Sequence, residues 1–126
     1  MTRINCIPVQ ELHDKHLLAE YRELPRIFKL ARVCHDTPKK YVLGKGHVKF
    51  FYDKLYYLYR RHEKLCEEMR KRGFTVNYPT HYYASFKDLN KAPMLWNDWQ
   101  PTQEAMELNR QRIQERLEDM RNKGVI

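Results

Sequence analysis

Apolar side chains recur every three or four positions over residues 9–33 of the chain. The core-facing series consists of Leu17, Tyr21, Leu24, Phe28 and Ala31. This spacing predicts an amphipathic helix with a single buried face. Proline lacks an N–H and clashes with the preceding turn, so we expect a kink or an interruption at Pro25.

Two further stretches carry the same period. In the second, over residues 47–72, the apolar series is Val48, Phe51, Leu55, Leu58, Leu65 and Met69, and Gly73 follows as a predicted C-terminal cap. His62 falls within that series, and we interpret it as a hydrogen-bonded core histidine. The third stretch, over residues 102–123, lies between Pro101 and Gly124 and buries Met106, Ile113, Leu117 and Met120.

Residues 74–100 form a long connection without a regular period, in which seven aromatic side chains are crowded. They are Phe74, Tyr78, Tyr82, Tyr83, Phe86, Trp96 and Trp99. Such residues in a small domain serve either to fill the core or to stack on nucleic-acid bases, and both alternatives stay open. The predicted fold is all-α, a single domain over residues 1–126 with three main helices.

The composition is that of a globular protein, with 32% charged and 42% hydrophobic residues. No apolar run approaches the roughly 18–20 residues of a bilayer span, and the N-terminus has no signal-peptide core. Cys6, Cys34 and Cys66 form no CxxC pair, and His13 with His16 lacks a third ligand at matching spacing. We therefore expect a cytoplasmic protein without a metal, and we also expect it to be a monomer that needs no cofactor.

The net charge of +8 makes a polyanion, DNA or RNA, the first partner to consider. Arg22 with Arg26 and Arg112 with Arg116 are pairs spaced four residues apart, and converging guanidinium groups bind phosphate well. Lys45 between two glycines offers a weaker phosphate site, for which an ordinary turn is the alternative. The remaining basic side chains of the second helix are predicted to cover its outer face: Arg60, Arg61, Lys64, Arg70, Lys71 and Arg72.

The start of the chain offers an uncommon nucleophile. Removal of Met1 would leave Thr2 with a free α-amine, whose ordinary pKa near ~7.7–8.0 leaves part of it unprotonated at neutral pH. Such amines form Schiff bases with electrophilic carbons, and a nearby carboxylate assists with proton transfer. Glu23, between Arg22 and Arg26, is the carboxylate that we expect to serve the amine.

Three strings of this sequence resemble a known family, the phage-type pyrimidine-dimer DNA glycosylases with abasic-site lyase activity. The strings are residues 1–5 (MTRIN), 16–27 (HLLAEYRELPRI) and 46–55 (GHVKFFYDKL), with looser agreement at 72–74 and 101–117. The resemblance implies a single all-α domain with the N-terminal arm lying among the helices. It also implies that the protein acts on double-stranded damaged DNA and flips out a base opposite the lesion.

The resemblance assigns a role to each candidate residue. The Thr2 amine would attack the sugar C1′, and Glu23 would stabilise the developing positive charge and assist the elimination. Arg3, His16, Arg22 and Arg26 would line the site, while Arg112 and Arg116 would grip phosphates. Residues 119–126 do not carry the aromatic, basic tail of the WYKYY kind that is common in the family. Activity on another lesion or on abasic sites, and a non-catalytic basic DNA-binding protein, stay open as alternatives.

Overall fold

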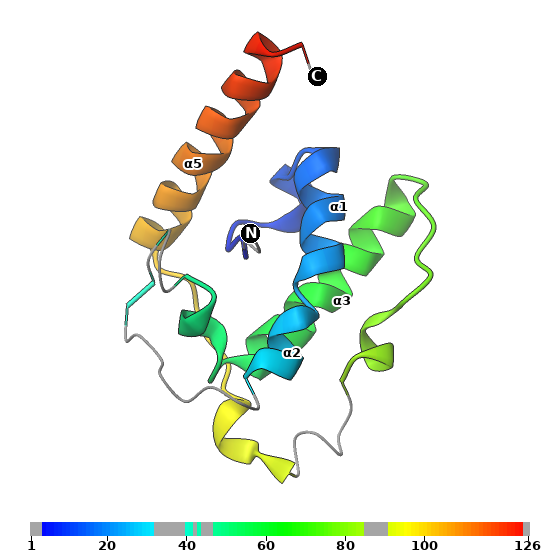
Figure 1. The fold of residues 1–126 in the computed structure, drawn as a ribbon, viewed down its shortest axis with the longest axis vertical. Coiled ribbons are helices and arrows are strands. Elements are labelled where there is room, and N and C mark those ends of the chain that lie inside the picture. Colours follow the sequence, from blue (N-terminus) through cyan, green and yellow to red (C-terminus); the bar gives the residue numbers. More distant parts are fainter. Residues whose placement is uncertain (1–3, 32–39, 42, 44–46, 85–90, 125–126) are drawn as a thin grey trace.

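The computed structural model describes residues 4–31, 40, 41, 43, 47–84 and 91–124. Within these ranges the chain is helical and has no strand, which confirms the predicted all-α fold (Figure 1). The only pairing of the β type in the described ranges is an isolated antiparallel bridge between Lys54 and Trp96. No helix within these ranges has the length and apolar character needed to cross a bilayer.

The first predicted helix is shorter than expected and is divided in two. Helix α1 spans Asp14–Glu23, and α2 spans Arg26–Leu30. The interruption predicted at Pro25 is confirmed, because Leu24 and Pro25 form a turn between the two helices. The predicted start at residue 9 is wrong: Val9–Glu11 forms the 3-10 helix η1, and Leu12 and His13 are extended. His13 then caps α1, since its Nδ1 accepts a hydrogen bond from the backbone N–H of Lys15.

The second predicted helix begins later than its apolar series does. Lys49–Phe51 forms the 3-10 helix η2, and α3 spans Leu55–Lys71. Lys54 interrupts the helix because its backbone bridges to Trp96, while its ammonium lies 3.9 Å from the centre of the Phe50 ring. The predicted cap is confirmed, because Gly73 has a φ of 87°, a left-handed conformation that favours glycine.

The third predicted helix agrees with the structure to within one residue at each end. Helix α5 spans Gln103–Asn122, and the Thr102 hydroxyl caps it by accepting a hydrogen bond from the backbone N–H of Ala105. Short 3-10 helices η3 (Thr80–Tyr82) and η4 (Pro93–Leu95) lie in the aromatic connection. Phe74, Tyr83, Trp96 and Trp99 pack against the core, whereas Tyr78 and Tyr82 are exposed.

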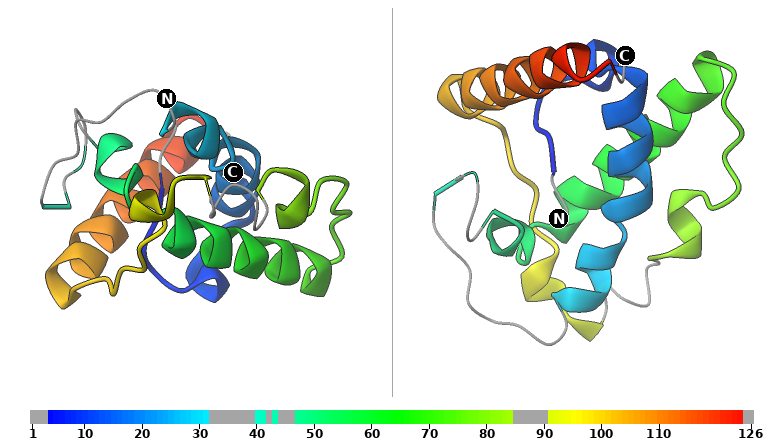
Figure 2. Two further views of the ribbon diagram at one scale, coloured as in Figure 1. Left: turned by 90° about the horizontal axis from the view of Figure 1, so that it is seen from below. Right: turned by 45° about the horizontal axis from the view of Figure 1, so that its top comes forward.

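The core lies chiefly between α1, α2 and α3, where Leu17, Leu24, Leu58 and Leu65 are fully buried. His62 is a core histidine as predicted, because its ring bonds to the Thr80 hydroxyl at 2.7 Å and to the Tyr21 carbonyl at 3.1 Å. Helix α5 lies apart from this layer. The N-terminal arm, residues 4–8, runs between α5 and the pair formed by α1 and α3 (Figures 1 and 2).

Candidate active site

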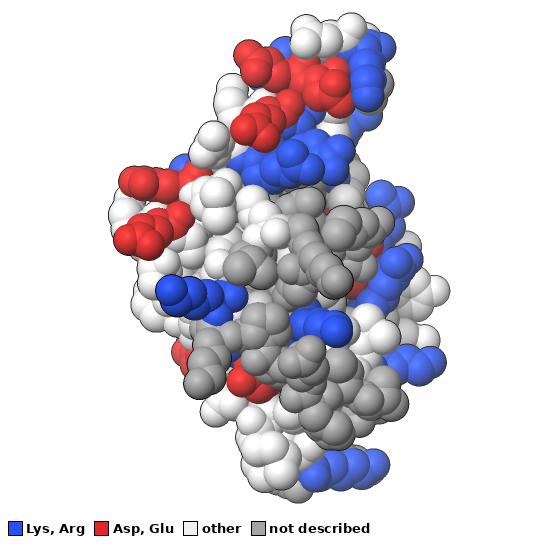
Figure 3. All heavy atoms as spheres, turned by 60° about the vertical axis from the view of Figure 1, so that its left-hand side comes forward, with Lys and Arg blue, Asp and Glu red and all other residues white. Residues whose placement is uncertain are grey.

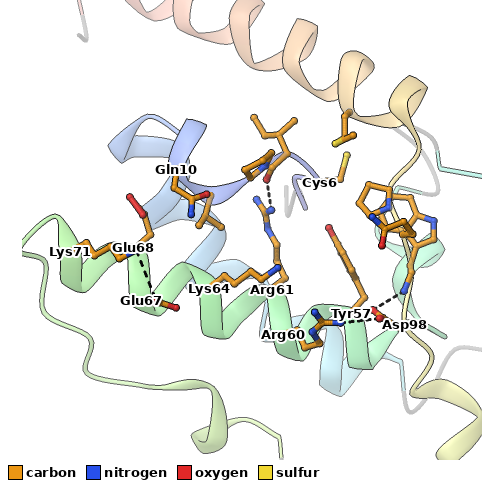
Figure 4. A pocket seen from close by; sticks show the side chains of 17 residues that line it. Cys6, Gln10, Tyr57, Arg60, Arg61, Lys64, Glu67, Glu68, Lys71 and Asp98 are labelled. Atoms are coloured by element: carbon orange, nitrogen blue, oxygen red, sulfur yellow. Dashed lines mark hydrogen bonds and ion pairs between the residues drawn. The ribbon is translucent and has the colours of Figure 1, made fainter.

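The backbone of the arm is buried, and side chains from other elements supply its hydrogen-bond partners. The N–H of Ile4 donates to His47 Nε2 at 2.9 Å. The N–H groups of Cys6 and Ile7 both donate to Asn109 Oδ1 on α5, at 2.8 and 3.3 Å. The carbonyl of Ile7 accepts a hydrogen bond from Arg61 on α3, whose side chain rises from the helix toward the arm (Figure 4). Three regions of the fold therefore hold the arm in place.

Asn5 links two helices through its side-chain amide. Its Nδ2 donates to Glu20 Oε1 on α1 at 2.8 Å, and its Oδ1 accepts from Asn109 Nδ2 on α5 at 2.8 Å. Since both ends of the amide are bonded, the side chain of Asn5 has a single orientation that satisfies its neighbours.

Glu20 and Arg61 form a buried ion pair beside Asn5. The Arg61 guanidinium bonds to both carboxylate oxygens, with Nε to Oε2 at 2.8 Å and Nη2 to Oε1 at 3.2 Å. The side chains are only 1% and 5% exposed. Burial disfavours the charged form of Arg61, but the charge and hydrogen bonds of Glu20 outweigh it and raise the pKa of the guanidinium above its ordinary value. We correct the prediction that Arg61 lies on the outer face of its helix.

The arm runs antiparallel to α1. Near the start of α1, Arg72 donates to the carbonyls of Val9 and Leu12 and pairs with Asp14. Further along α1, Asn5 contacts Glu20. Going back along the arm therefore leads toward the C-terminal end of α1, where Glu23 lies.

Three polar residues of α1 share the face that the arm follows. His16, Glu20 and Glu23 are spaced by four and three residues, which places them on one side of the helix. Glu20 shows that this side faces the arm, because it bonds to Asn5. His16 and Glu23 are half-buried. The structure thus brings two of the predicted site residues onto one face beside the arm.

The predicted arginine pairs lie on exposed surfaces. Arg22 is the penultimate residue of α1 and Arg26 the first of α2, and both are exposed. On α5, Arg116 is exposed, and Arg112 is half-exposed with Glu115 at 3.6 Å. The face in Figure 3 carries Lys and Arg side chains over α5 and over the body below it, interrupted by clusters of Asp and Glu. These groups are accessible to a large anionic ligand.

Thr2, Arg3 and Lys45 lie outside the described residues, so the predictions for them stay predictions. The described part of the chain contains no group of three or more His, Cys, Asp or Glu side chains that could hold a metal ion. Cys6 and Cys66 are free and buried. Burial raises the pKa of the Cys6 thiol to about 11, against weaker opposing effects of Tyr41 and Arg61, so it is a poor nucleophile at neutral pH.

The residues that hold the arm are not among the predicted site residues: they are Asn5, Glu20, His47, Arg61 and Asn109. A signal for two of them was present. Glu20 lies three residues after Leu17 and four before Leu24, and Arg61 is spaced in the same way between Leu58 and Leu65. Opposite charges at core-facing positions of two helices indicate a buried ion pair.

The fold and the site define an all-α protein in which a buried arm leads along the helix face that bears Glu20 and Glu23, with exposed arginines nearby. Residues 1–82 match the family model described as pyrimidine dimer DNA glycosylase. The chain belongs to this family. Membership supports DNA glycosylase activity on pyrimidine dimers in general terms, with DNA as the partner.

Proposed function

We propose that the protein cleaves the N-glycosidic bond of a damaged pyrimidine, a cyclobutane pyrimidine dimer, through a Schiff base with the Thr2 amine. The strand is then broken by β-elimination at the resulting abasic site. The observation that carries this proposal is the course of the arm: its buried residues run along α1 toward the end that bears Glu23. Family membership supports the substrate class.

The length of chain before Ile4 fits this role. Two residues separate the Thr2 amine from the N–H of Ile4, and they span at most roughly 7 Å. Because Ile4 is buried and hydrogen-bonded to His47, the amine would stay within that distance of a fixed point of the arm, which supports the proposal. This tether supplies much of the orientation that an attack on a sugar carbon requires.

The reaction proceeds in four steps and uses no cofactor. The amine attacks C1′, and the damaged nucleobase leaves with the electrons of the glycosidic bond. Loss of the amine proton and opening of the sugar ring give a C1′ imine. A proton-accepting group then removes a proton from C2′. The C3′–O bond breaks, and the 3′ phosphate leaves with the electrons of that bond. Water hydrolyses the imine and restores the amine.

Glu23 is the acid–base residue in this scheme. Its carboxylate stabilises the positive charge that develops at C1′ and accepts and returns protons during ring opening and elimination. Its half-buried position on the arm-facing side of α1 supports the assignment, because a partly desolvated carboxylate interacts more strongly with a nearby cation.

The basic residues hold the DNA in this proposal. Arg3, His16, Arg22 and Arg26 line the site around the damaged nucleotide. Lys45, Arg112 and Arg116 bind phosphates of the double-stranded substrate, which fixes its register without reading its sequence. The exposure of Arg22, Arg26 and Arg116 supports these roles. We propose that the protein works as a monomer.

The test compares Glu23→Gln with Glu67→Gln, a matched change at an exposed glutamate on α3. Each variant is assayed on a duplex with one cyclobutane dimer and on a duplex with one abasic site. We expect Glu23→Gln to lower strand cleavage by about 10²-fold or more while DNA binding is kept, as for loss of an acid–base group. Glu67→Gln should cleave like the unchanged protein. Normal cleavage by Glu23→Gln would remove Glu23 from the mechanism.

A further inference from the structure

The contacts of the arm point to a second group of residues that serve the reaction without touching the substrate. Residues 4–7 cross the molecule without regular secondary structure, and no strand lies beside them in the described ranges. A buried segment of this kind must find partners for its N–H and C=O groups. Here Asn109 accepts from two successive N–H groups, and Arg61 donates to the carbonyl of the second.

These side chains fix the register of the arm, because each bonds to named backbone atoms. A shift of the arm by one residue would move Asn5 away from Glu20 and would also separate Cys6 and Ile7 from Asn109. The carboxylate of Glu20 would then lack the Asn5 amide. Such losses are costly for groups that are 0–3% exposed, as Asn5, Glu20 and Asn109 are.

A buried ion pair is a poor means of gaining stability, because apolar residues of similar volume do as well or better. Here the Glu20–Arg61 pair and the two asparagines form one connected network that joins α1, α3 and α5 at the arm. A network of this kind specifies one arrangement rather than a more stable one. That arrangement keeps the residue before Asn5 at a set place along α1.

We infer that Asn109 is a positioning residue, which acts through the arm to hold the chain start in register with Glu23. The inference rests on the proposed function, since it assigns the network a role only if the Thr2 amine is the nucleophile. Asn109 is well placed for this, because it bonds directly to the arm and lies on the helix that also carries Arg112 and Arg116. DNA bound on α5 would thus contact a helix that is hydrogen-bonded directly to the arm.

The test uses Asn109→Ala, with Gln111→Ala at an exposed site of the same helix as the matched control. Single-turnover trapping by borohydride on an abasic duplex, at saturating protein, measures Schiff base formation. Binding of a duplex with an uncleavable abasic analogue measures affinity. We expect the trapping rate of Asn109→Ala to fall about 10–100-fold, as a small misplacement of a reacting group does, with a Kd changed less than about threefold. Gln111→Ala should keep the rate and the Kd.

Hydrogen exchange supplies a readout that does not depend on the reaction. In Asn109→Ala the amides of Cys6 and Ile7 should exchange at least about tenfold faster, because they lose their acceptor, while amides inside α3 keep their protection. If Asn109→Ala fails to fold, Asn5→Ala replaces it. This change leaves the acceptor of Cys6 and Ile7 in place and removes only the link between Glu20 and Asn109.

The outcomes distinguish a failure of the positioning role of Asn109 from a failure of the proposed function. Faster exchange of the arm together with slower trapping supports the inference. Faster exchange with an unchanged trapping rate overturns it, because the register of the arm would then not matter. If the unchanged protein gives no adduct at Thr2, the proposed function itself is wrong, and the positioning role falls with it. A raised Kd together with an unchanged trapping rate at saturating protein would assign Asn109 to DNA binding and overturn the inference.

Discussion

Replacing Glu20 with Gln tests how much the buried Glu20–Arg61 pair beside the arm contributes to the unfolding free energy. The carboxylate is 1% exposed and accepts from Arg61 Nε at 2.8 Å, from Arg61 Nη2 at 3.2 Å and from Asn5 Nδ2 at 2.8 Å. Glutamine retains one oxygen and turns the other into an N–H group that faces a donor. It also leaves the guanidinium of Arg61, 5% exposed, without a counter-charge.

Breaking a buried pair from one side costs about 3–5 kcal/mol of unfolding free energy. This is a large share of the roughly 5–15 kcal/mol that stabilises a typical domain. The assay is urea unfolding followed by circular dichroism, with the slope of the transition checked for constancy. Glu67→Gln is the control, since its pair with Lys71 is 3.8 Å long and both side chains are more than 60% exposed. We expect no measurable change there.

A double variant sharpens the test. Glu20→Met combined with Arg61→Leu removes both charges and fills their space with apolar atoms, so it should recover part of the lost stability. Recovery should be incomplete, because the Asn5 amide and the Ile7 carbonyl lose their partners. A loss below about 1 kcal/mol for Glu20→Gln, or a loss no larger than that of Glu67→Gln, would refute the reasoning.

Three further predictions concern other parts of the molecule. Tyr57→Phe should leave the unfolding free energy unchanged or raise it slightly, because the Tyr57 hydroxyl is buried and has no hydrogen-bond partner within the described residues. Tyr21→Phe should lower the unfolding free energy by about 1–2 kcal/mol, because it removes two hydrogen bonds to the backbone of Tyr78. Equal effects of the two changes in urea unfolding would contradict this. Burial lowers the pKa of His62, against smaller opposing effects of the Tyr21 carbonyl and Glu20. Below about pH 6.5 the unfolded state therefore takes up a proton that the folded state does not. The unfolding free energy should fall as the pH drops through that range. His62→Gln should flatten that part of the pH dependence, and an unchanged curve would assign it to other groups. Arg112→Ala and Arg116→Ala should each weaken binding to duplexes of any sequence and reduce the slope of log K against log salt concentration by about 1. Arg70→Ala on α3 serves as the control. Unchanged slopes for the α5 variants would remove both arginines from the phosphate contacts.

The last helix and the end of α3 followed closely from the sequence, because their signals are local. Thr102 with Gly124 bounded the last helix to within one residue, and Gly73 marked the end of α3. The start of α3 was missed because it depends on Lys54 meeting Trp96, a contact between residues far apart in the chain. The interruption at Pro25 followed from the chemistry of proline alone.

The site was less predictable, since its parts are brought together only by the fold. The sequence analysis named His16 and Glu23 as candidates, and the structure places them on one face of α1. The partners of the arm lie as much as 104 residues away in sequence, as for Asn5 and Asn109. A buried arginine looks like a surface one unless its spacing is compared with the apolar series, as the misplacement of Arg61 demonstrates.

The most direct test of the central claim is to locate the covalent bond. The protein is mixed with a duplex containing one abasic site and reduced with borohydride, and the adduct is digested and sequenced by mass spectrometry. We predict that the nucleotide remnant lies on the α-amine of Thr2 and that prior acetylation of this amine abolishes the adduct. An adduct on an internal lysine, or a full yield after acetylation, would contradict the account.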